Sequence, residues 1–423
     1  MVNKEFIPNG WRKVTIDDIC ELRRGASPRP ISDPKYFGNG AGWVRISDVT
    51  RAGNYLKQTE QYLSKLGESK SVKVTPGEVI MSICATIGRP IIVDMEACIH
   101  DGFVVFKNLS EHVNNLFFLY WLKTKENYFN SLGQQGTQKN LNTNIVKKTE
   151  ILLPPLPVQR KIATILSSVD EAIEKTEAII EQTEKVKKGL MQQLLTKGIG
   201  HTKFKKTEIG EIPEEWDVLP LGNIIHSLLD FRGKTPKKLG MDWGNGNIRA
   251  LSANNVKMGY IDFDEECYLG SEELYNKWMT KGDLSKGDII FTMEAPLGNV
   301  AQVPDNQKYI LSQRVIGIKP KDFVDKDFLK YYMMSPSFQN RLKLQATGTT
   351  AKGISQKNLL PLEIVVPSIN EQKKITEILA TVDKKLEREK VVLKELSQIK
   401  KGLMQSLLTG KVRVKVDDEV VSS

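Results

Sequence analysis

The sequence predicts an α+β protein with a pseudo-twofold internal duplication: two similar globular domains separated by two long antiparallel helices that form a coiled-coil-like spacer. Two observations predict this fold class. One motif occurs twice, 213 residues apart (404 − 191), which is about half of the 423-residue chain. Two apolar stripes with helical spacing also run for about 40 residues each, longer than a domain of this size requires. Solenoid repeats have periods of roughly 20 to 50 residues, so the motif marks domain-sized copies.

The two copies agree best near their ends. Residues 186–196 read Val-Lys-Lys-Gly-Leu-Met-Gln-Gln-Leu-Leu-Thr, and residues 399–409 repeat them almost unchanged. At the same offset, Pro154 and Gln159 match Pro367 and Gln372. The pattern Ile-Pro-x-x-Trp opens both copies, at 7–11 and 212–216. The interiors differ far more, so one part of each copy has stayed alike while the other has diversified.

Composition limits the class of protein. No run of about 20 apolar residues exists, so we expect no segment to span a membrane. The four cysteines form no disulfide framework, and the first residues lack the apolar core of a signal peptide, so we expect a cytoplasmic protein. The net charge of +10 favours a polyanionic partner such as nucleic acid.

Each copy opens with a globular region of mixed helix and strand character. Strand-like runs at 79–83, 91–93 and 103–106 have counterparts at 288–292, 299–303 and 315–318. An apolar run at 116–122, echoed at 328–333, predicts a short helix. Between these elements we align 25–28 with 233–236, and 44–46 with 248–250. Each copy is therefore expected to hold one compact α+β domain.

After a proline-rich segment at 153–157 the chain is predicted to be helical. Apolar residues recur at steps of three and four from Ile162 to Leu194, and again from Ile375 to Leu407, as in a heptad seam. An alternative is that each stripe packs only on its own domain. A helix of 40 residues is about 60 Å long and extends beyond such a domain, so we expect the two helices to pack on each other.

These patterns divide the chain into six segments. We expect a first domain at 1–153, a first helix at 154–198, a linker at 199–211, a second domain at 212–366, a second helix at 367–410 and a C-terminal tail at 411–423.

No catalytic constellation is recognisable in the sequence. The four histidines do not stand at metal-ligand spacing. Gly233-Lys234-Thr235 is followed by proline and lacks the earlier glycine of a phosphate-binding loop. Asp288 and Glu294 are spaced like a nuclease pair, but no lysine follows at a useful position. The sequence therefore predicts a recognition protein and disfavours an enzyme with its own methyltransferase or nuclease activity.

Three repeated features resemble a known family. They are the Ile-Pro-x-x-Trp opening through Trp11 and Trp216, the Pro-x-x-x-x-Gln start of each long helix, and the Lys-Lys-Gly-Leu-Met-Gln-x-Leu-Leu-Thr helix end. Together they extend over essentially the whole chain. By them the chain resembles the specificity (S) subunit of type I restriction-modification systems.

The resemblance implies a function and a set of partners. Each globular domain would be a target-recognition domain that reads one half of a bipartite sequence in double-stranded DNA. The helices would set the spacing and dock two methyltransferase (M) subunits, and two restriction (R) motor-nuclease subunits would complete the complex. The chain itself would be non-catalytic and bind no cofactor, with AdoMet, ATP and Mg on the partner subunits.

Candidate DNA contacts lie in loops and turns rich in basic and amide side chains. Arg and Lys reach guanine edges, while Asn and Gln pair with adenine. The alternative for each is an ordinary solvated side chain. The candidates in the first copy are Arg23, Arg24, Arg29, Arg45, Gln134, Gln135, Gln138, Lys139 and Asn140. Those in the second are Arg232, Lys234, Lys237, Lys238, Arg249, Thr349, Thr350 and Lys352.

Candidate docking residues lie in the repeated helix end, which would offer two equivalent apolar patches to two methyltransferase subunits. They are Leu190, Met191, Leu194 and Leu195, with their copies Leu403, Met404, Leu407 and Leu408. The alternative for them is packing between the helices. For the chain as a whole, the rival interpretation is a structural coiled-coil spacer that presents two modules with no affinity for DNA.

Overall fold

A computed structural model of the chain describes residues 7–133, 140–348 and 352–416. Its contacts divide the chain into two compact units. Unit 1 consists of Met1–Glu177 and Val391–Ser423, and unit 2 consists of Ala178–Lys390. Each unit therefore contains one globular region, the beginning of the long helix that follows it, and the end of the other long helix.

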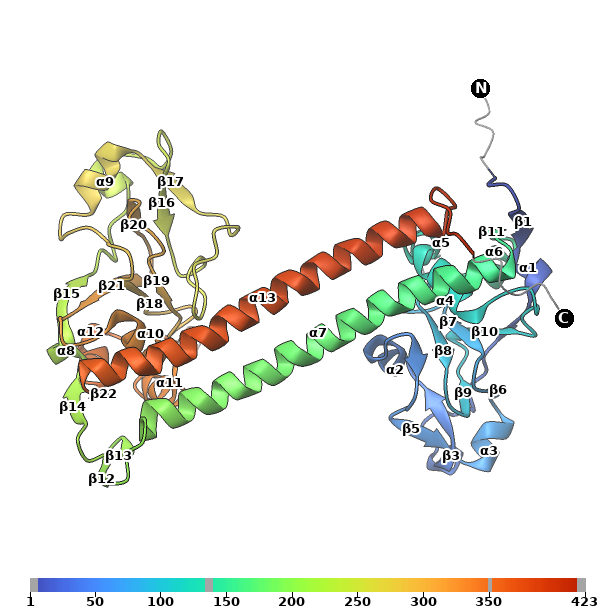
Figure 1. The fold of residues 1–423 in the computed structure, drawn as a ribbon, viewed down its shortest axis with the longest axis horizontal. Helices are drawn as coiled ribbons and strands as arrows, with labels where there is room; N and C mark the ends of the chain where they lie inside the picture. Colours follow the sequence, from blue (N-terminus) through green and yellow to red (C-terminus); the bar gives the residue numbers. More distant parts are fainter. Residues whose placement is uncertain (1–6, 134–139, 349–351, 417–423) are drawn as a thin grey trace. The chain divides into compact units, whose positions relative to one another are not determined.

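Unit 1 contains two larger sheets and a two-stranded ribbon (Figure 1). The five-stranded sheet has the order β2-β10-β7-β8-β4, and the four-stranded sheet has the order β5-β3-β9-β6. The ribbon pairs β1 with β11. The strands are β1 (Arg12–Thr15), β2 (Glu21–Arg24), β3 (Phe37–Val44), β4 (Tyr55–Leu56), β5 (Gln61–Leu63), β6 (Val72–Val74), β7 (Val79–Ser82), β8 (Pro90–Val93), β9 (Ala97–Ile99), β10 (Phe103–Lys107) and β11 (Glu150–Leu153).

Short helices surround these sheets. The largest is α4 (Asn115–Thr124), which is capped by the Asn114 side chain and contributes six consecutive buried residues to the core. The others in the globular region are α1 (Ile16–Ile19), η1 (Pro34–Tyr36), α2 (Ile46–Arg51), α3 (Lys65–Ser69), α5 (Glu126–Leu132) and α6 (Thr143–Lys147).

Unit 2 repeats this plan. Its sheets have the orders β15-β21-β18-β19 and β17-β16-β20, with β14-β22 as the ribbon. The strands are β12 (Phe204–Thr207), β13 (Gly210–Pro213), β14 (Asp217–Pro220), β15 (Ile225–Leu229), β16 (Ile248–Leu251), β17 (Tyr268–Gly270), β18 (Ile289–Thr292), β19 (Val300–Gln302), β20 (Tyr309–Leu311), β21 (Val315–Pro320) and β22 (Glu363–Val366). The short helices are α8 (Leu221–Ile224), η2 (Lys237–Leu239), α9 (Glu272–Trp278), α10 (Lys326–Met334), α11 (Pro336–Leu344) and α12 (Gln356–Leu359).

The two units share their topology in detail. In each unit one sheet has a central antiparallel pair, β10–β7 in unit 1 and β21–β18 in unit 2. The second sheet contains a parallel pair, β3–β9 in unit 1 and β16–β20 in unit 2. The predicted α+β fold class with internal duplication is confirmed. The apolar runs at 116–122 and 328–333 lie within α4 and α10 as expected. No helix in the described ranges has both the length and the apolar content to cross a membrane.

The long helices are α7 (Leu156–Lys197) and α13 (Ile369–Leu407). In unit 1 the beginning of α7 lies beside the end of α13, where Asp170 and Lys400 form an ion pair at 2.5 Å. In unit 2 the end of α7 lies beside the beginning of α13, where Lys187 and Asp383 do the same at 2.5 Å. The helices are therefore antiparallel within each unit, as predicted.

A buried glutamine fixes the start of each long helix. Gln159 is fully buried, and its Nε2 donates to the carbonyls of Pro154 at 2.8 Å and His112 at 2.9 Å. Its Oε1 accepts from the backbone N–H of Asn114, the residue that caps α4. Unit 2 repeats these bonds with Gln372, Pro367, Phe323 and Asp325. The Pro-x-x-x-x-Gln motif thus attaches the start of each long helix to the globular region that precedes it.

A tryptophan covers the end of each long helix. Trp216 packs over Gly198 after α7, where an added Cβ would approach the ring to 2.7 Å. Trp11 packs in the same way over Gly410 after α13, with an approach of 3.3 Å. Both glycines have left-handed backbone, with φ of 65° and 71°. The opening motif and the helix-end motif are therefore two sides of one interface, which is built twice.

Replacing Gln159 with Ala is expected to destabilise unit 1 by about 2 kcal/mol, because the change leaves the buried Pro154 carbonyl and two part-buried backbone groups without this partner. Denaturant unfolding of the purified chain measures this loss. The matched control is Gln192→Ala, whose side chain is exposed on α7. If the two variants are equally stable, the glutamine does not fix the helix.

Candidate DNA interface and docking surfaces

In unit 1 the predicted DNA contacts gather at one edge of the five-stranded sheet. Strand β2 ends at Arg24 and β7 ends at Ser82, while their common neighbour β10 begins at Phe103. The segments that leave this edge are 25–29, 83–89 and 100–102. Asn140 joins them through a bridge to Cys84. The candidate contacts near Arg24 and the candidate contact Asn140, which are more than 100 residues apart in the sequence, therefore meet at this sheet edge.

Asp101 organises the basic residues at this edge. Its carboxylate accepts from Ser27 Oγ at 2.7 Å and from Arg29 at 2.8 Å, and its carbonyl accepts from Arg24 Nε at 2.9 Å. Both arginines stay largely exposed. Burial would raise the pKa of the Asp101 carboxyl, but the bond from Ser27 and the charge of Arg29 outweigh it and lower the pKa. Asp101 therefore holds two guanidinium groups at the surface, that of Arg29 through its carboxylate and that of Arg24 through its backbone carbonyl.

Unit 2 builds the same edge with different side chains. Strands β15 and β18 end at Leu229 and Thr292, and β21 begins at Val315. Beyond them, Arg232 forms an ion pair with Asp230 at 2.6 Å. Gln356 donates to the same carboxylate at 2.5 Å. The framework is common to both units while the exposed groups differ, as expected of two readers with different targets.

A left-handed alanine occurs at the same turn in both units. Ala85 follows β7 with φ of 57°, and Ala295 follows β18 with φ of 40°. A side chain in this region costs about 1 to 2 kcal/mol. Next to each alanine the chain forms an isolated bridge, Cys84 to Asn140 and Glu294 to Gly353. The bridges hold the strained turn in place and connect it to the loop that contains further candidate contacts.

The other predicted DNA contacts differ in exposure and in hydrogen-bond partners. Arg45 follows β3 near this edge, where its guanidinium donates to Gln61. Lys234 instead donates inward, to the carbonyls of Lys277 and Trp278. Burial, and then the nearby charge of Lys281, lowers the pKa of Lys234. Exposed candidates at these turns are Arg23, Lys237, Lys238 and Lys352. Gln134, Gln135, Gln138, Lys139, Thr349 and Thr350 lie outside the described residues.

The alignment of 44–46 with 248–250 is wrong. Strand register pairs Val44 with Ile99 and Leu251 with Leu311. Ile99 lies four residues before Phe103, the first paired residue of β10, and Leu311 lies four residues before Val315, the first paired residue of β21. Val44 therefore corresponds to Leu251, and Arg249 is not the counterpart of Arg45. Arg249 lies within β16, with its guanidinium 4.7 Å from the centre of the Phe263 ring. Divergent interiors and a shift in loop length concealed this register in the sequence.

Sequence reasoning missed several residues at the two edges. These are Cys84, Asp101, Glu294, Gln313 and Arg314, which come from strand ends without a recognisable motif. The structure also accounts for Asp288 and Glu294, the two residues spaced like a nuclease pair, because each forms ion pairs with basic side chains. Asp288 is only 1% exposed and pairs with lysines 319 and 326, at 3.2 and 2.6 Å. Glu294 pairs instead with Arg314 at 3.4 Å. In the described ranges no group of acidic, histidine or cysteine side chains is arranged to hold a metal ion.

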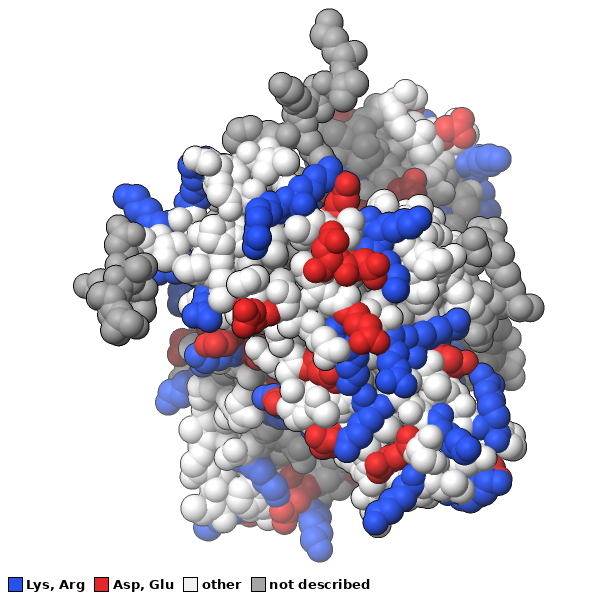
Figure 2. Space-filling view, turned by 90° about the vertical axis from the view of Figure 1, so that its right-hand side faces the viewer, with Lys and Arg blue, Asp and Glu red and all other residues white. Residues whose placement is uncertain are grey.

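Basic charge alone does not mark a binding face. Figure 2 shows that, on the face in view, lysine and arginine side chains alternate with acidic ones and leave no patch of a single sign. Many of these charges are paired at the surface, and such pairs contribute little. On this face the charges therefore mark no candidate site, and it is the sheet edges that bring candidate contacts together.

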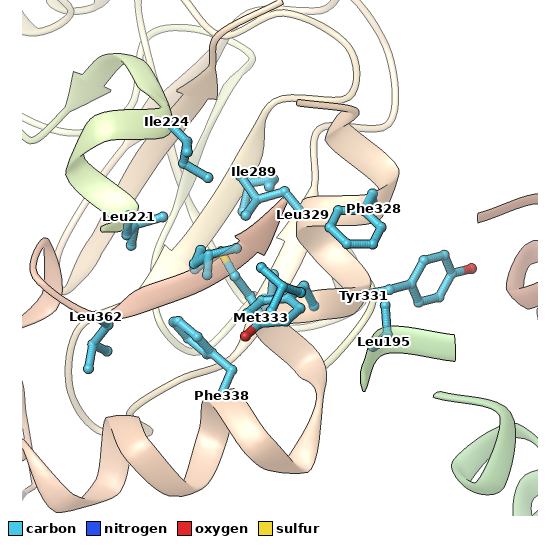
Figure 3. Close-up of a cluster of buried hydrophobic side chains, with 14 of the residues drawn as sticks. Leu195, Leu221, Ile224, Ile289, Phe328, Leu329, Tyr331, Met333, Phe338 and Leu362 are labelled. Atoms are coloured by element: carbon cyan, nitrogen blue, oxygen red, sulfur yellow. The ribbon is translucent and has the colours of Figure 1, made fainter. Parts of the chain in front are cut away.

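The predicted docking residues pack inside the units. Met191, Leu194 and Leu195 are buried in the core of unit 2, and Figure 3 shows Leu195 on the helix beside Tyr331. In unit 1, Leu407 and Leu408 are buried in the corresponding core, and Leu190, Leu403 and Met404 are partly buried against the two cores. For the five buried side chains the packing alternative accounts for their position, because little of their surface is left for a partner.

A second repeated contact joins the two helices to each domain. Tyr120 on α4 donates to Asp170 at 2.7 Å, and Asp170 also pairs with Lys400 of α13. Burial alone would raise the pKa of Asp170, but bonds from Lys400, Tyr120 and Asn54 lower it. Unit 2 repeats the group with Tyr331, Asp383 and Lys187. The lysine of the helix-end motif therefore has a structural role.

One apolar row on each helix does remain exposed. In unit 2, Ile179 and Val186 of α7 are 40% and 45% exposed. In unit 1, Val392 and Ile399 of α13 are 41% and 51% exposed. The pairs match at the offset of 213 (392 − 179 and 399 − 186). Residues seven apart lie on one helix face, so each unit presents an equivalent apolar row outside the helix–helix seam.

Comparison with known proteins agrees with this architecture. The profile of the family described as type I restriction modification DNA specificity domain matches residues 8–185 and 213–398. The MjaVIII type I restriction enzyme specificity subunit of Methanocaldococcus jannaschii is 30% identical, covering 97% of this chain and 94% of that protein. The EcoBI specificity subunit of Escherichia coli is 23% identical, covering 87% and 78%.

A solved structure shares the fold. The S subunit of the type I restriction-modification system of M. genitalium superimposes with a TM-score of 0.59 at 16% identity, covering 96% of this chain and 97% of that one. The family profile, which matches both copies, defines the class of protein as a DNA specificity subunit. The chain belongs to the family of type I restriction-modification specificity subunits. Members of this family recognise DNA and are the non-catalytic subunits of their complexes.

Replacing Arg24 with Gln is expected to weaken duplex DNA binding and to reduce the slope of log affinity against log salt by about 1, because the guanidinium charge that displaces a counterion from the DNA is lost. Binding is measured at several salt concentrations with the methyltransferase subunit present. Arg12→Gln, an exposed arginine on the β1–β11 ribbon, is the control. Equal slopes for both variants would place the DNA elsewhere.

Proposed function

We propose that each unit reads one half of a bipartite target in double-stranded DNA through its sheet edge. The observation that carries this proposal is that one framework of strand ends is built twice with different exposed side chains. The readers would be the domains at 1–153 and 212–366. The segments at 154–198 and 367–410 would be the spacer helices, and 199–211 and 411–423 the linker and the tail.

The same proposal assigns partners to the helices. Two equivalent surfaces suit two methyltransferase subunits, and two motor-nuclease subunits would complete a cytoplasmic restriction complex. AdoMet, ATP and Mg would be bound by those partners. The exposed rows at Ile179/Val186 and Val392/Ile399 add surfaces that a partner can reach. The docking candidates from the sequence would then hold the helix ends in place by packing inside the units. They are Leu190, Met191, Leu194 and Leu195, with Leu403, Met404, Leu407 and Leu408.

The rival function is a structural spacer with two modules that do not bind DNA. The arginines held by Asp101 at one edge, and by Asp230 at the other, argue against it. A pure spacer has no need to fix exposed guanidinium groups at equivalent strand ends of both modules. Salt-independent behaviour toward DNA, with the methyltransferase present, would favour the rival.

The chain and its methyltransferase subunit, expressed together, are expected to methylate adenine at one motif with two fixed parts and an unspecified gap. Arg24→Gln is expected to relax only one part, and Arg232→Gln only the other, because each unit reads alone. Methylation mapping across the host genome measures both. A single uninterrupted motif, or relaxation of both parts by one variant, would contradict this division of labour.

Val186→Glu and Ile399→Glu are each expected to reduce the bound methyltransferase from two subunits to one, since a charge on an apolar contact opposes docking. The double variant is expected to bind none. Native mass spectrometry of the co-expressed complex counts the subunits. Gln192→Glu, an exposed position of the same helix about 120° around the axis from the row, is the control. An unchanged count in the double variant would exclude these rows as the docking surface.

A further inference from the structure

One position in the strand framework differs sharply between the units. Strand register places Trp43 beside Cys98 in unit 1 and Ala250 beside Ile310 in unit 2. Their outer neighbours are Gln61 and Tyr268. Because the registers run in parallel, Trp43 and Ala250 are structural counterparts. The largest side chain in one unit is thus replaced by one of the smallest in the other.

In unit 1 this space is filled. Trp43 is 1% exposed, and its ring lies 5.8 Å from that of His100. His100 in turn contacts Phe103 edge-on at 4.8 Å. Burial lowers the pKa of His100 within this aromatic group. The unit 1 position is part of the core and offers no room for a ligand.

In unit 2 the space is open. Ser312 stands at the position of His100, one residue before the exposed Gln313, and together with Ala250 it borders a cavity of about 420 Å³. Protein sites for small molecules occupy about 300 to 1,000 Å³, so a single planar heterocycle fits. The cavity exists because two bulky residues of unit 1 have small counterparts here.

Aromatic rings form one wall of this cavity. Trp243 and Tyr268 stack with centroids 5.2 Å apart and planes 7° from parallel, and Trp243 also contacts Trp278 at 5.3 Å. Tyr268 is 64% exposed, although it lies in a strand beside this group. Such stacked surfaces bind planar bases regardless of sequence, because every base has a π face.

Polar groups that bear no internal hydrogen bond border the cavity. Within the described ranges, the side-chain amides of Asn254 and Gln313 bond to no other group. Amides of this kind pair with the edges of bases. Gln313 and Arg314 directly precede β21, and Lys234 to Pro236 form the turn after β15. The cavity therefore borders the sheet edge proposed to contact DNA.

We propose that the cavity of unit 2 accepts one base that has swung out of the duplex, from the half-site that this unit reads. This proposal rests on the function proposed above. Stacking on Trp243 and Tyr268, with hydrogen bonds from Asn254 and Gln313, replaces the stacking and pairing that the base loses. Unit 1, which has Trp43 in this place, reads its half-site without extruding a base. The two halves of the target are thus read by different physical means.

The test uses the full chain with its methyltransferase subunit and duplexes that carry the target found by methylation mapping. Each nucleotide of both half-sites is replaced in turn by an abasic site, and binding is measured. Where a base is extruded, removal of the base opposite it abolishes the cost of unpairing. The methyltransferase subunits extrude the adenines that they methylate, so the positions opposite those adenines are set aside. At the remaining positions, binding is expected to tighten about tenfold at one position of the second half-site and at none of the first.

Two variants connect this effect to the cavity. Ala250→Trp copies unit 1 and fills the space, and Tyr268→Ala removes an exposed stacking ring without altering the core. Both are expected to weaken binding of the intact target about tenfold and to abolish the abasic enhancement. Tyr260→Ala, an exposed tyrosine of the same unit outside the cavity, is expected to leave both unchanged.

Each outcome decides the proposal. A scan with no enhanced position besides those opposite the methylated adenines, or an enhancement at the further position that survives in Tyr268→Ala, overturns it. Loss of methyltransferase binding in either variant, with DNA binding intact, would instead make the cavity a protein-docking site and also overturns it. Failure of the unaltered complex to bind the intact target refutes the proposed function itself, which separates that failure from failure of the base-extrusion proposal.

Discussion

The structure depends on how the ends of the two long helices are anchored. Each helix begins in the core of one unit, through Gln159 or Gln372, and ends in the core of the other, beneath Trp216 or Trp11. The three repeated motifs are the parts of these anchors. Because a buried glutamine whose bonds are all satisfied is costly to disrupt, helix and domain behave as one piece. A recognition domain can therefore diversify while its attachment to the helix stays the same.

That attachment also explains where diversity is tolerated. Strands β10 and β21 carry the core, while the segments beyond their ends carry Asp101 with its arginines in unit 1 and Asp230 with Arg232 in unit 2. These edge groups are exposed and contribute little to stability, so they can change without unfolding the domain. The interior also differs between the units. Where unit 1 has Trp43 and His100, unit 2 has Ala250 and Ser312, and a cavity takes the place of a filled core position.

Two faces of the long helices have different surroundings. On one face, apolar packing along the helix–helix seam and the Asp–Lys pairs hold the helices to each other and to the domains. The leucines of the helix-end motif take part in this packing. The row at Ile179 and Val186, with its copy in unit 1, lies outside that seam. Most of the leucine and methionine side chains of the repeated motif therefore pack inside the units. The rows at Ile179/Val186 and Val392/Ile399 are exposed apolar surface on the helices.

The sequence by itself determined the duplication, the α+β class, the long helices and the family, because repeats and heptad spacing are local patterns that survive in one dimension. It also located the turns at Arg24 and Arg232. Only the tertiary structure decided that Asn140 meets Cys84, that Lys234 turns inward, and that Leu195 is buried. Strand register decided that Arg249 is no counterpart of Arg45, and that Ala250 stands where Trp43 does. Register and burial depend on contacts between segments far apart in the chain, so no local pattern could reveal them.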